Sequence, residues 1–328
     1  MGTTPLQTRH TLPALSLTAV AAGSIAFAAS ADTITVCLDG SCDFTDPAAA
    51  VNAAVTGDTV QIAAGTYPLA ATILIYGKNL TLRGAVDAQG RPATVLSGQG
   101  ARSVLDVLSV SNLTRFENLV VTNGRSDYGG GVFLSGADPV FRNCRFTNNV
   151  ATWLGGAMRL SSASHPTLID CELSGNSAGN TQFPGRGSAG AISVQNNTLT
   201  LIGCTVTSNS ADGTGGAFLL TSSGTVILES TRVCGNLAPN GVQVHLNGGG
   251  GTVVEDPRSC VSSDCASCPT TPACTGDIDW DGAVNGADLG LMLSSWGSCP
   301  GCAEDLNHDG TVNGLDLGMM LGTWGACG

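Results

Sequence analysis

The side chains with the most regular chemical spacing lie in two segments near the C-terminus, 277–288 and 305–316. Each segment has oxygen-bearing side chains at positions 1, 3, 5, 9 and 12 and a glycine at position 6, the arrangement of a twelve-residue calcium loop. The predicted side-chain ligands are Asp277, Asp279, Asp281, Asn285 and Asp288, then Asp305, Asn307, Asp309, Asn313 and Asp316. Position 7 offers a backbone carbonyl, from Ala283 and Thr311. Because this many hard oxygen donors suit Ca²⁺ better than zinc or copper, the sequence predicts two bound calcium ions.

One short amphipathic helix is expected after each loop, over 288–296 and 316–324, and none before it. The apolar positions recur at i, i+3, i+4 and i+7, through Leu289, Met292, Leu293 and Trp296 and then Leu317, Met320, Leu321 and Trp324. This duplication, over residues 274–328, resembles the type I dockerin family. The resemblance implies a calcium-dependent module that docks secreted carbohydrate-active proteins onto cohesin scaffolds. Loop positions 10 and 11, usually polar in cohesin-binding dockerins, are Gly286-Ala287 and Gly314-Leu315, which weighs against a cohesin partner.

Four segments of similar pattern fill the middle of the chain, at 130–151, 155–178, 189–211 and 215–238. They share an asparagine near the end, at Asn149, Asn176, Asn209 and Asn236. The intervals between these asparagines are 27, 33 and 27 residues. A repeat of this length cannot bury its own apolar face, so it must stack on its neighbours in a solenoid. Short β-rich runs separated by Gly, Asn and Ser, without helical periodicity, favour a β-helix.

Stacked repeats predict columns of like side chains about 4.8 Å apart, the spacing of paired strands. Two inward apolar columns are expected, of Phe133, Met158, Ile192 and Phe218 and of Phe146, Leu173, Val206 and Val233. The repeated asparagines are expected to adopt left-handed backbone geometry at a corner and to hydrogen-bond to one another. A row of ligand-binding amides is the less favoured alternative. An inward column of free thiols is also expected, of Cys144, Cys171 and Cys204.

A short helix is expected at 47–55, before the stretches GDTVQIAAGTY (57–67) and KNLTLRG (78–84). These features resemble the N-terminal cap and first coils of the pectate-lyase-like superfamily of right-handed parallel β-helices. The resemblance covers about residues 45–240. It implies an all-β fold, a right-handed parallel β-helix of seven or eight coils, with the small α-helical calcium module behind it.

Enzymes of that superfamily act from carboxylates clustered in a groove, so such groups are the catalytic candidates here. Asp170 has no second acid in its column, whose other members are Asn143, Gly203 and Ser230. Glycoside hydrolysis, which uses two carboxyl groups, is therefore not supported at Asp170. Arg145 is expected beside Glu172 on the next coil, as a surface ion pair or, less favoured, as the acid and base of a lyase. Arg159 is a further candidate for a groove, and whether the chain is an enzyme stays undecided at this level.

The 13 cysteines all follow the N-terminal apolar run, and export would favour disulfides. Each calcium repeat is bracketed by a pair at equal spacing, Cys274 with Cys299 and Cys302 with Cys327. Disulfides there would stabilise a module too small for a large core. Zinc is the less favoured alternative for two C-x-x-C spacings, at Cys265 and Cys268 and at Cys299 and Cys302. Cys37 and Cys42 are expected to close a small loop.

Residues 1–31 have the pattern of a signal peptide, with Arg9 before an apolar run that ends in the small-x-small sequence Ala29-Ser30-Ala31. The rest divides into a β-helix with its cap helix at 32–257, a Cys/Pro-rich linker at 258–273 and the calcium module at 274–328. No later stretch is long and apolar enough to span a membrane. A net charge of −12 with a single lysine argues against nucleic acid as a partner.

Three functions stay open for such a secreted or cell-surface-attached chain, because a fold alone does not define a function. The favoured one is a β-helix that binds carbohydrate or a cell-surface partner, with the calcium module for attachment. The alternatives are a divergent polysaccharide lyase or glycoside hydrolase, and a non-catalytic structural repeat protein.

Overall fold

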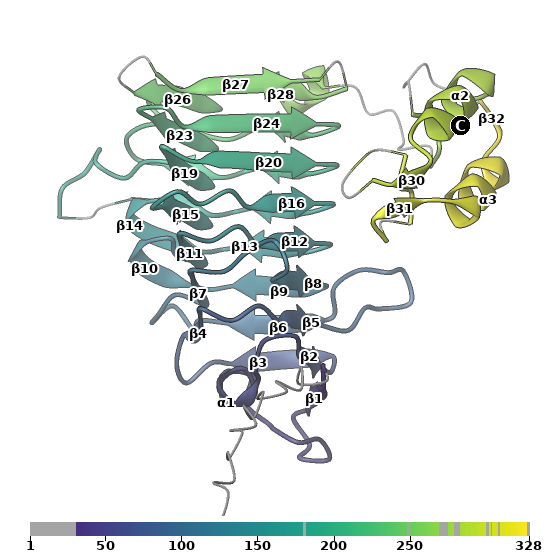
Figure 1. Cartoon of the computed structure of the whole chain (residues 1–328). Helices are drawn as coiled ribbons and strands as arrows, with labels where there is room; N and C mark the ends of the chain where they lie inside the picture. Colours follow the sequence, from purple (N-terminus) through teal and green to yellow (C-terminus); the bar gives the residue numbers. More distant parts are fainter. Residues whose placement is uncertain are drawn as a thin grey trace, which may run out of the picture. The chain divides into compact units, whose positions relative to one another are not determined.

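The chain forms a solenoid of parallel strands and a small C-terminal module with two helices (Figure 1). The structure, a computed structural model, describes residues 31–179, 182–247, 250–256, 258–268, 275–278, 283–299, 302, 304–307 and 309–326. The predicted signal peptide, apart from Ala31, lies outside the described residues. Within the described part of the chain, no helix has the length and apolar character needed to cross a membrane.

Four parallel sheets make up the solenoid. A coil contributes at most one strand to each sheet. Sheet A consists of β1 (Thr33–Val36), β2 (Thr59–Ile62), β5 (Thr81–Arg83), β8 (Arg115–Glu117), β12 (Val140–Arg142), β16 (Thr167–Ile169), β20 (Thr198–Ile202), β24 (Thr225–Glu229) and β27 (Thr252–Glu255). Sheet B consists of β3 (Gly65–Pro68), β6 (Thr94–Ser97), β9 (Leu119–Thr122), β13 (Arg145–Thr147), β17 (Glu172–Ser174), β21 (Thr205–Thr207), β25 (Arg232–Cys234) and β28 (Cys260–Ser262). Sheet C consists of β4 (Ile73–Tyr76), β7 (Leu105–Leu108), β11 (Val132–Ser135), β15 (Met158–Ser161), β19 (Ile192–Gln195), β23 (Phe218–Thr221) and β26 (Val244–Asn247). Sheet D consists of β10 (Arg125–Tyr128), β14 (Val150–Leu154), β18 (Ser177–Ala178) and β22 (Ser210–Ala211).

Each coil runs from sheet C to sheet A and then to sheet B, and four coils return through sheet D. The corner from sheet A to sheet B is made by one residue with positive φ. The φ values are 47°, 52°, 63° and 50° at Asn143, Asp170, Gly203 and Ser230. Gly, Asn and Asp adopt this left-handed geometry at the lowest cost, which explains three of the four residue types.

One of the two predicted inward columns is confirmed, and the other is corrected at one residue. Phe146, Leu173, Val206 and Val233 lie in register in sheet B and are fully buried. In sheet C the inward residue that pairs with Met158 is Val132, whereas the predicted Phe133 pairs with Arg159 on the outer face. The prediction was wrong by one residue because three apolar residues in a row, 132–134, hide the period of two that separates the faces of a strand.

A buried asparagine ladder follows sheet B, as predicted, and consists of Asn149, Asn176, Asn209 and Asn236. Each Nδ2 donates to Oδ1 of the asparagine on the next coil, at 3.0, 2.8 and 2.9 Å. The left-handed φ falls one residue earlier than predicted, at Asn148, Gly175, Ser208 and Gly235. Since the preceding residue makes the turn, the ladder side chains are free to point into the core. The inward free thiols of Cys144, Cys171 and Cys204 are confirmed.

The cap helix α1 (Pro47–Ala53) closes the N-terminal end of the core. It starts at the N-cap Asp46, whose carboxylate accepts the backbone N–H of Ala48 at 3.0 Å. At the other end, Lys78 Nζ donates to the carbonyls of Val51 at 2.5 Å and Ala54 at 2.8 Å. These carbonyls have no partner within the helix, so the single lysine of the chain ties the cap to the coils. The predicted disulfide between Cys37 and Cys42 is present.

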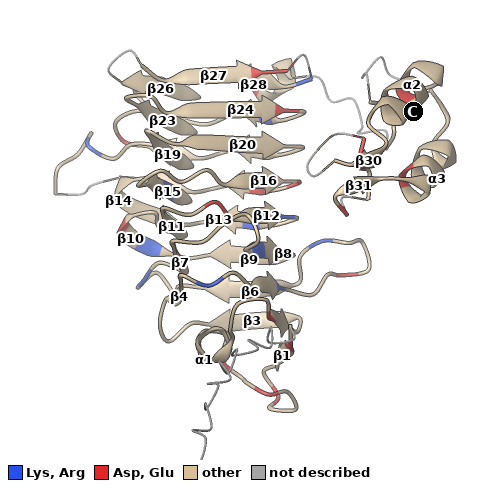
Figure 2. Cartoon of the chain, viewed as in Figure 1, with Lys and Arg blue, Asp and Glu red and all other residues tan. Residues whose placement is uncertain are grey.

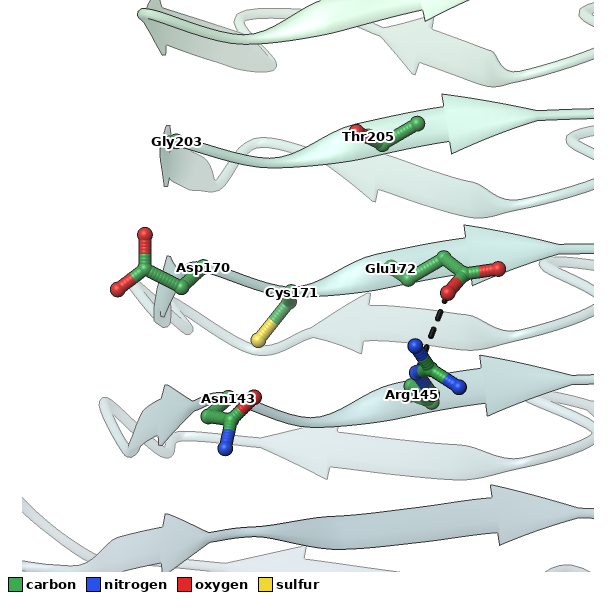
Figure 3. A pocket seen from close by; sticks show the side chains of 7 residues that line it. All are labelled: Asn143, Arg145, Asp170, Cys171, Glu172, Gly203 and Thr205. Atoms are coloured by element: carbon green, nitrogen blue, oxygen red, sulfur yellow. Dashed lines mark ion pairs between the residues drawn. The ribbon is translucent and has the colours of Figure 1, made fainter. Parts of the chain in front are cut away.

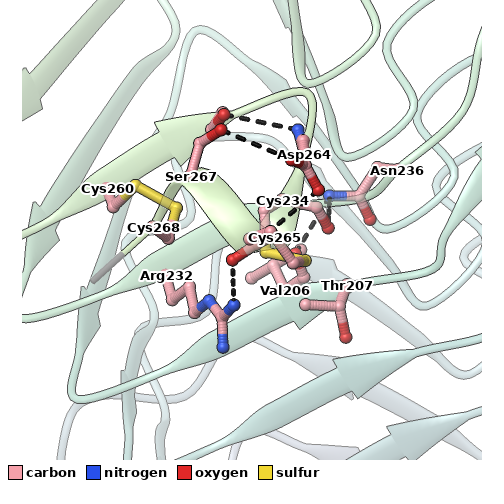
Figure 4. The surroundings of a disulfide bond; sticks show 12 residues. Val206, Thr207, Arg232, Cys234, Asn236, Cys260, Asp264, Cys265, Ser267 and Cys268 are labelled. Carbon is pink, nitrogen blue, oxygen red and sulfur yellow. Dashed lines mark hydrogen bonds between the residues drawn. A yellow bond between two sulfur atoms is a disulfide. The ribbon is translucent and has the colours of Figure 1, made fainter. Parts of the chain in front are cut away.

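Two disulfides lie at the C-terminal end of the solenoid (Figure 4). Cys234 of β25 is bonded to Cys265, and Cys260 of β28 is bonded to Cys268. Cys265 opens the 3₁₀ helix η1 (Cys265–Ser267). Cys265 and Cys268 are therefore disulfide partners of other cysteines, the favoured alternative to zinc. Because β28 falls inside the predicted linker 258–273, the β-helix extends beyond the predicted boundary at 257.

The C-terminal module contains the helices α2 (Gly286–Ser294) and α3 (Gly314–Gly322). Both begin and end two residues before the predicted bounds, because the helix starts inside the loop. β29 (Ala283–Val284) pairs with β32 (Gly325–Ala326), and β30 (Gly297–Ser298) pairs with β31 (Thr311–Val312), so each loop pairs with the segment that follows the other helix. Cys299 is bonded to Cys302, so the predicted pairing across each repeat is wrong for these two. Cys274 and Cys327 lie outside the described residues.

Candidate functional site

The second predicted calcium loop, 305–316, folds around its own acidic side chains. The Asp305 carboxylate accepts the backbone N–H of Asp309 at 3.0 Å and of Gly310 at 2.7 Å. The Asp316 carboxylate accepts the backbone N–H of Asn307 at 3.0 Å and of Asn313 at 2.9 Å. These bonds hold the first and last predicted ligands of the loop in place.

Burial and hydrogen bonds to the backbone dominate the electrostatics of Asp305 in this loop. Asp305 and Asp316 are 0% exposed. Burial raises the pKa of Asp305, and the charges of Asp316 and Asp309 raise it further, while the two backbone N–H donors act in the opposite direction. Residues 274–328 include no Lys or Arg, and Figure 2 shows acidic but no basic residues along the two helices. Buried anions in proteins are paired with a cation or bind a metal, so this oxygen-rich loop fits Ca²⁺.

The first loop, 277–288, repeats the part of this geometry that the structure describes. Asp288 is 0% exposed, like Asp316, and its carboxylate accepts the backbone N–H of Ile278 at 2.5 Å and of Asn285 at 2.8 Å. Asp277 is half-buried. Asp279 and Asp281 lie outside the described residues. The duplication in the sequence is thus matched by a repeated placement of the last loop carboxylate.

The ligands predicted at positions 9 and 12 also cap the helices. Asn285 and Asn313 are the N-cap residues, and their Oδ1 atoms accept the backbone N–H of Ala287 and Leu315 at 2.8 Å. Their Nδ2 groups donate to the backbone carbonyls at position 7, those of Ala283 and Thr311, at 3.1 Å. Asp288 and Asp316 complete capping boxes. Ligand spacing alone did not predict this second role, although an Asn followed three residues later by an Asp is a known start signal of a helix.

A second candidate site lies on the solenoid, where sheet A turns into sheet B. A hollow of about 280 Å³ is lined by Asn143, Arg145, Asp170, Cys171, Glu172, Gly203 and Thr205 (Figure 3). Arg145 and Glu172 lie in register on β13 and β17, and Arg145 Nε is 3.2 Å from Glu172 Oε2. Their side chains are 40% and 39% exposed. Ser174 Oγ donates to the other carboxylate oxygen of Glu172 at 2.9 Å.

Asp170 occupies the corner of this hollow and is exposed, whereas Glu172 is partly buried. Desolvation by the surrounding protein raises the pKa of the Asp170 carboxyl, and the nearby Arg142 partly offsets this effect. A Cβ at Gly203 on the next coil would lie 2.6 Å from Asp170 Oδ1, so a side chain there would displace the carboxylate. In Figure 3 the Asp170 and Glu172 side chains point to different sides, and Glu172 points toward Arg145.

This arrangement suits recognition better than catalysis. The Arg145 guanidinium is paired with Glu172 and offsets its charge. The two lining carboxylates belong to one coil and diverge, whereas glycoside hydrolysis needs two that flank one bond. The hollow therefore offers half-exposed charged and amide groups for hydrogen bonds to a polar ligand.

The structure brings three of the four predicted catalytic candidates together and leaves out the fourth. Arg145, Glu172 and Asp170 line the hollow, but Arg159 lies on β15 of sheet C, away from the corner of sheets A and B. Arg142, whose charge acts on Asp170, was missed by the sequence reasoning. Its outward position at the end of β12 was the available signal.

The comparisons with known proteins bear on the fold. A family model described as a right-handed β-helix region matches residues 101–256. No curated protein matches the sequence. Among solved structures, a pectin methylesterase from Aspergillus niger aligns with a TM-score of 0.45 and 16% identity, over 72% of this chain and 86% of that chain. A similarity this low says nothing about a substrate. The matched model and the parallel sheets confirm the predicted all-β, right-handed parallel β-helix.

Proposed function

We propose that the chain is an exported calcium-binding β-helix protein, whose C-terminal module binds two Ca²⁺ ions and serves for attachment. The observation that carries the calcium proposal is the full burial of Asp288, Asp305 and Asp316 in a module without Lys or Arg. Bound Ca²⁺ would place a positive charge among these buried carboxylates. The loops would contribute the predicted ligands, and the capping boxes would hold the last ligand of each loop on its helix.

Attachment is proposed because both helices and the residues just after them expose apolar side chains. Leu293 and Leu321 are each 52% exposed, and Trp296 and Trp324 are 50% and 49% exposed. Each of these residues has its counterpart 28 positions away in the other repeat. Exposed apolar groups in such number are typical of surfaces that contact another protein or a cell surface.

Calorimetric titration of the full exported chain with Ca²⁺ tests the calcium proposal. The wild type is expected to bind two ions, and the double variant Asp277→Ala with Asp305→Ala to bind neither with comparable affinity. Asp127→Ala, at an exposed acid on β10, is the matched control and should leave both sites intact. Unchanged binding in the double variant would refute the proposal.

For the β-helix we propose binding of a polysaccharide, with the hollow around Arg145 and Glu172 as the contact. The half-exposed ion pair and the Asn143 amide are hydrogen-bonding groups of the kind that sugar hydroxyls need. A second candidate function is polysaccharide cleavage of the lyase type, favoured by the direct contact between Arg145 and Glu172.

A panel of polysaccharides separates the two functions of the β-helix. Retention of a glycan without new reducing or unsaturated ends supports binding. Product formation that is lost in Glu172→Gln supports the lyase, and silence of the whole panel leaves a structural protein. Thr205 pairs with Glu172 in register and lines the hollow. Thr205→Ala therefore tests whether the glycan contacts the hollow, and it should weaken retention by less than Arg145→Ala.

A further inference from the structure

The disulfide between Cys299 and Cys302 lies against the second predicted calcium loop, 305–316. The backbone N–H of Asp305, the first predicted ligand of that loop, donates to the carbonyl of Cys302 at 3.3 Å. The backbone N–H of Cys299 donates to the carbonyl of Gly310, the turn residue at position 6 of the loop, at 3.0 Å. The two cysteines therefore hold two different points of the same loop.

These contacts form a closed ring. The backbone N–H of Gly310 donates to the Asp305 carboxylate at 2.7 Å, so the two points are also joined inside the loop. The ring runs from Cys299 to Gly310, Asp305 and Cys302, and the disulfide returns it to Cys299. A covalent bond that closes such a ring holds the first ligand and the turn in one arrangement before any ion binds. Preorganisation of this kind raises affinity, because less freedom is lost on binding.

The strand next to the disulfide contacts a further predicted ligand. Ser298 of β30 precedes Cys299 and pairs with Thr311 of β31, whose carbonyl is the predicted ligand at position 7. The disulfide thus joins the entry of the second loop to the strand that flanks its middle. The first loop pairs instead through β29 with β32, near the other end of the module, and so provides an internal reference.

This disulfide is also more accessible than the others that the structure describes. Cys299 and Cys302 are both half-buried. Each of the other three described disulfides includes a buried cysteine, namely Cys37, Cys234 or Cys268, which are at most 7% exposed. Thiol–disulfide exchange requires that a thiolate reach one of the sulfur atoms, so the half-buried pair is the one that should respond first to a reductant.

We propose that the Cys299–Cys302 disulfide is a redox switch that controls calcium binding at the second loop. With the two thiols reduced, the ring is open and the second site is weak. Oxidation after export closes the ring: a disulfide of the oxidant takes up two electrons and two protons from the thiols, is released as two thiols, and the bond between the two Sγ atoms forms. The cysteines act as positioning residues, since neither supplies a ligand atom to Ca²⁺. The inference rests on the proposed calcium binding and export.

Calorimetric titration of the full exported chain with Ca²⁺ tests the switch. The wild type is expected to bind two ions. Cys299→Ser with Cys302→Ser should keep one site at its original affinity and weaken the other by about tenfold or more, a typical coupling between linked sites. Cys37→Ser with Cys42→Ser removes a similarly short disulfide far from the loops in sequence and is the matched control, with both affinities unchanged. All solutions are freed of zinc, because the Cys299, Cys302 and Glu304 ligand atoms lie within 4.8 Å of one another and suit such an ion once reduced.

A second measurement uses only the wild type. The chain is equilibrated in glutathione buffers with saturating Ca²⁺ or with EGTA, and the reduced fraction of each cysteine pair is measured by alkylation and mass spectrometry. Because coupling between two equilibria is reciprocal, Ca²⁺ should favour the oxidised Cys299–Cys302 pair by the same factor of about ten or more. The Cys37–Cys42 pair in the same samples should not respond to Ca²⁺.

The outcomes distinguish this inference from the calcium proposal. Two sites of unchanged affinity in Cys299→Ser with Cys302→Ser would overturn the switch and leave the calcium proposal standing. A reduced fraction of the Cys299–Cys302 pair that is equal with Ca²⁺ and with EGTA would overturn it as well, even if that variant does not fold. A wild type that binds no Ca²⁺ when fully oxidised would refute both proposals.

Discussion

The β-helix and the C-terminal module bury their interiors by different means. In the β-helix one apolar cluster continues through the coils, and the polar asparagines inside it satisfy one another. Among its described residues, the module has a core of five fully or nearly fully buried apolar side chains, those of Ile278, Val284, Met292, Val312 and Met320. It also buries carboxylates that repel one another. The comparison teaches that stacked repeats satisfy their own interior, whereas a small duplicated module without Lys or Arg in its sequence buries acidic groups, for which we propose an external cation.

The largest expected effect is the response to calcium removal. A chelator should unfold the module and leave the β-helix folded, because a ligand at a thousandfold excess over its Kd contributes about 4 kcal/mol. Three of the four tryptophans, Trp280, Trp296 and Trp324, belong to the module by sequence. Their fluorescence should therefore change on chelation, while the far-ultraviolet β-sheet signal persists. Identical melting of both signals with and without chelator would contradict the comparison.

Removal of an aromatic ring from the core should lower the stability of the β-helix and leave the module unchanged. Phe146 is fully buried and packs edge-on against Phe141, at 5.4 Å between ring centroids. Phe146→Ala should lower the free energy of unfolding of the β-helix by about 3–5 kcal/mol, in urea titration, because it leaves a cavity. Calcium binding by the module should not change. Phe183→Ala, at a ring that is 49% exposed, is the control and should cost less than about 1 kcal/mol.

The asparagine ladder should show a smaller loss. Asn176 Oδ1 accepts both the backbone N–H and the side-chain amide of Asn149, each at 3.0 Å. Asn176→Ala should cost about 1–3 kcal/mol, since it leaves buried donors without acceptors. Asn52→Ala, at an exposed position of α1, should have little effect. Equal stability of the two variants in urea would mean that the ladder contributes nothing.

The smallest expected effect concerns pH. The pKa of Asp170 is raised in the folded β-helix, so the folded state holds this proton more tightly than the unfolded chain. The stability from this group is fully present below its ordinary pKa and is lost as the pH rises through its folded pKa. The melting temperature of Asp170→Asn should therefore rise relative to that of the wild type as the pH rises from acid to neutral. A constant difference across that range would show that Asp170 is ionised normally.

Several features could be predicted from the sequence because they depend on neighbours along the chain or on exact repetition. The asparagine ladder, the inward thiols and the Arg145–Glu172 pair all follow from aligned repeats, and the structure has each of them. Phe133 was misplaced because the period of two is hidden in an apolar run. The Cys299–Cys302 bond was missed because disulfide pairing depends on how the two halves of the module meet.

The sequence by itself determined the repeat, the parallel solenoid and the two acidic loops for which we propose calcium binding, because each is a pattern of residue types at constant spacing. Only the tertiary structure decided which of the outward side chains share a surface. It placed Arg145, Asp170 and Glu172 around one hollow and put Arg159 on another sheet, where it is buried and donates to Ser193 and Gln195. The physical reason is that burial and charge balance depend on contacts between coils and on the direction in which each side chain leaves its strand, and neither is written in the spacing of the residues.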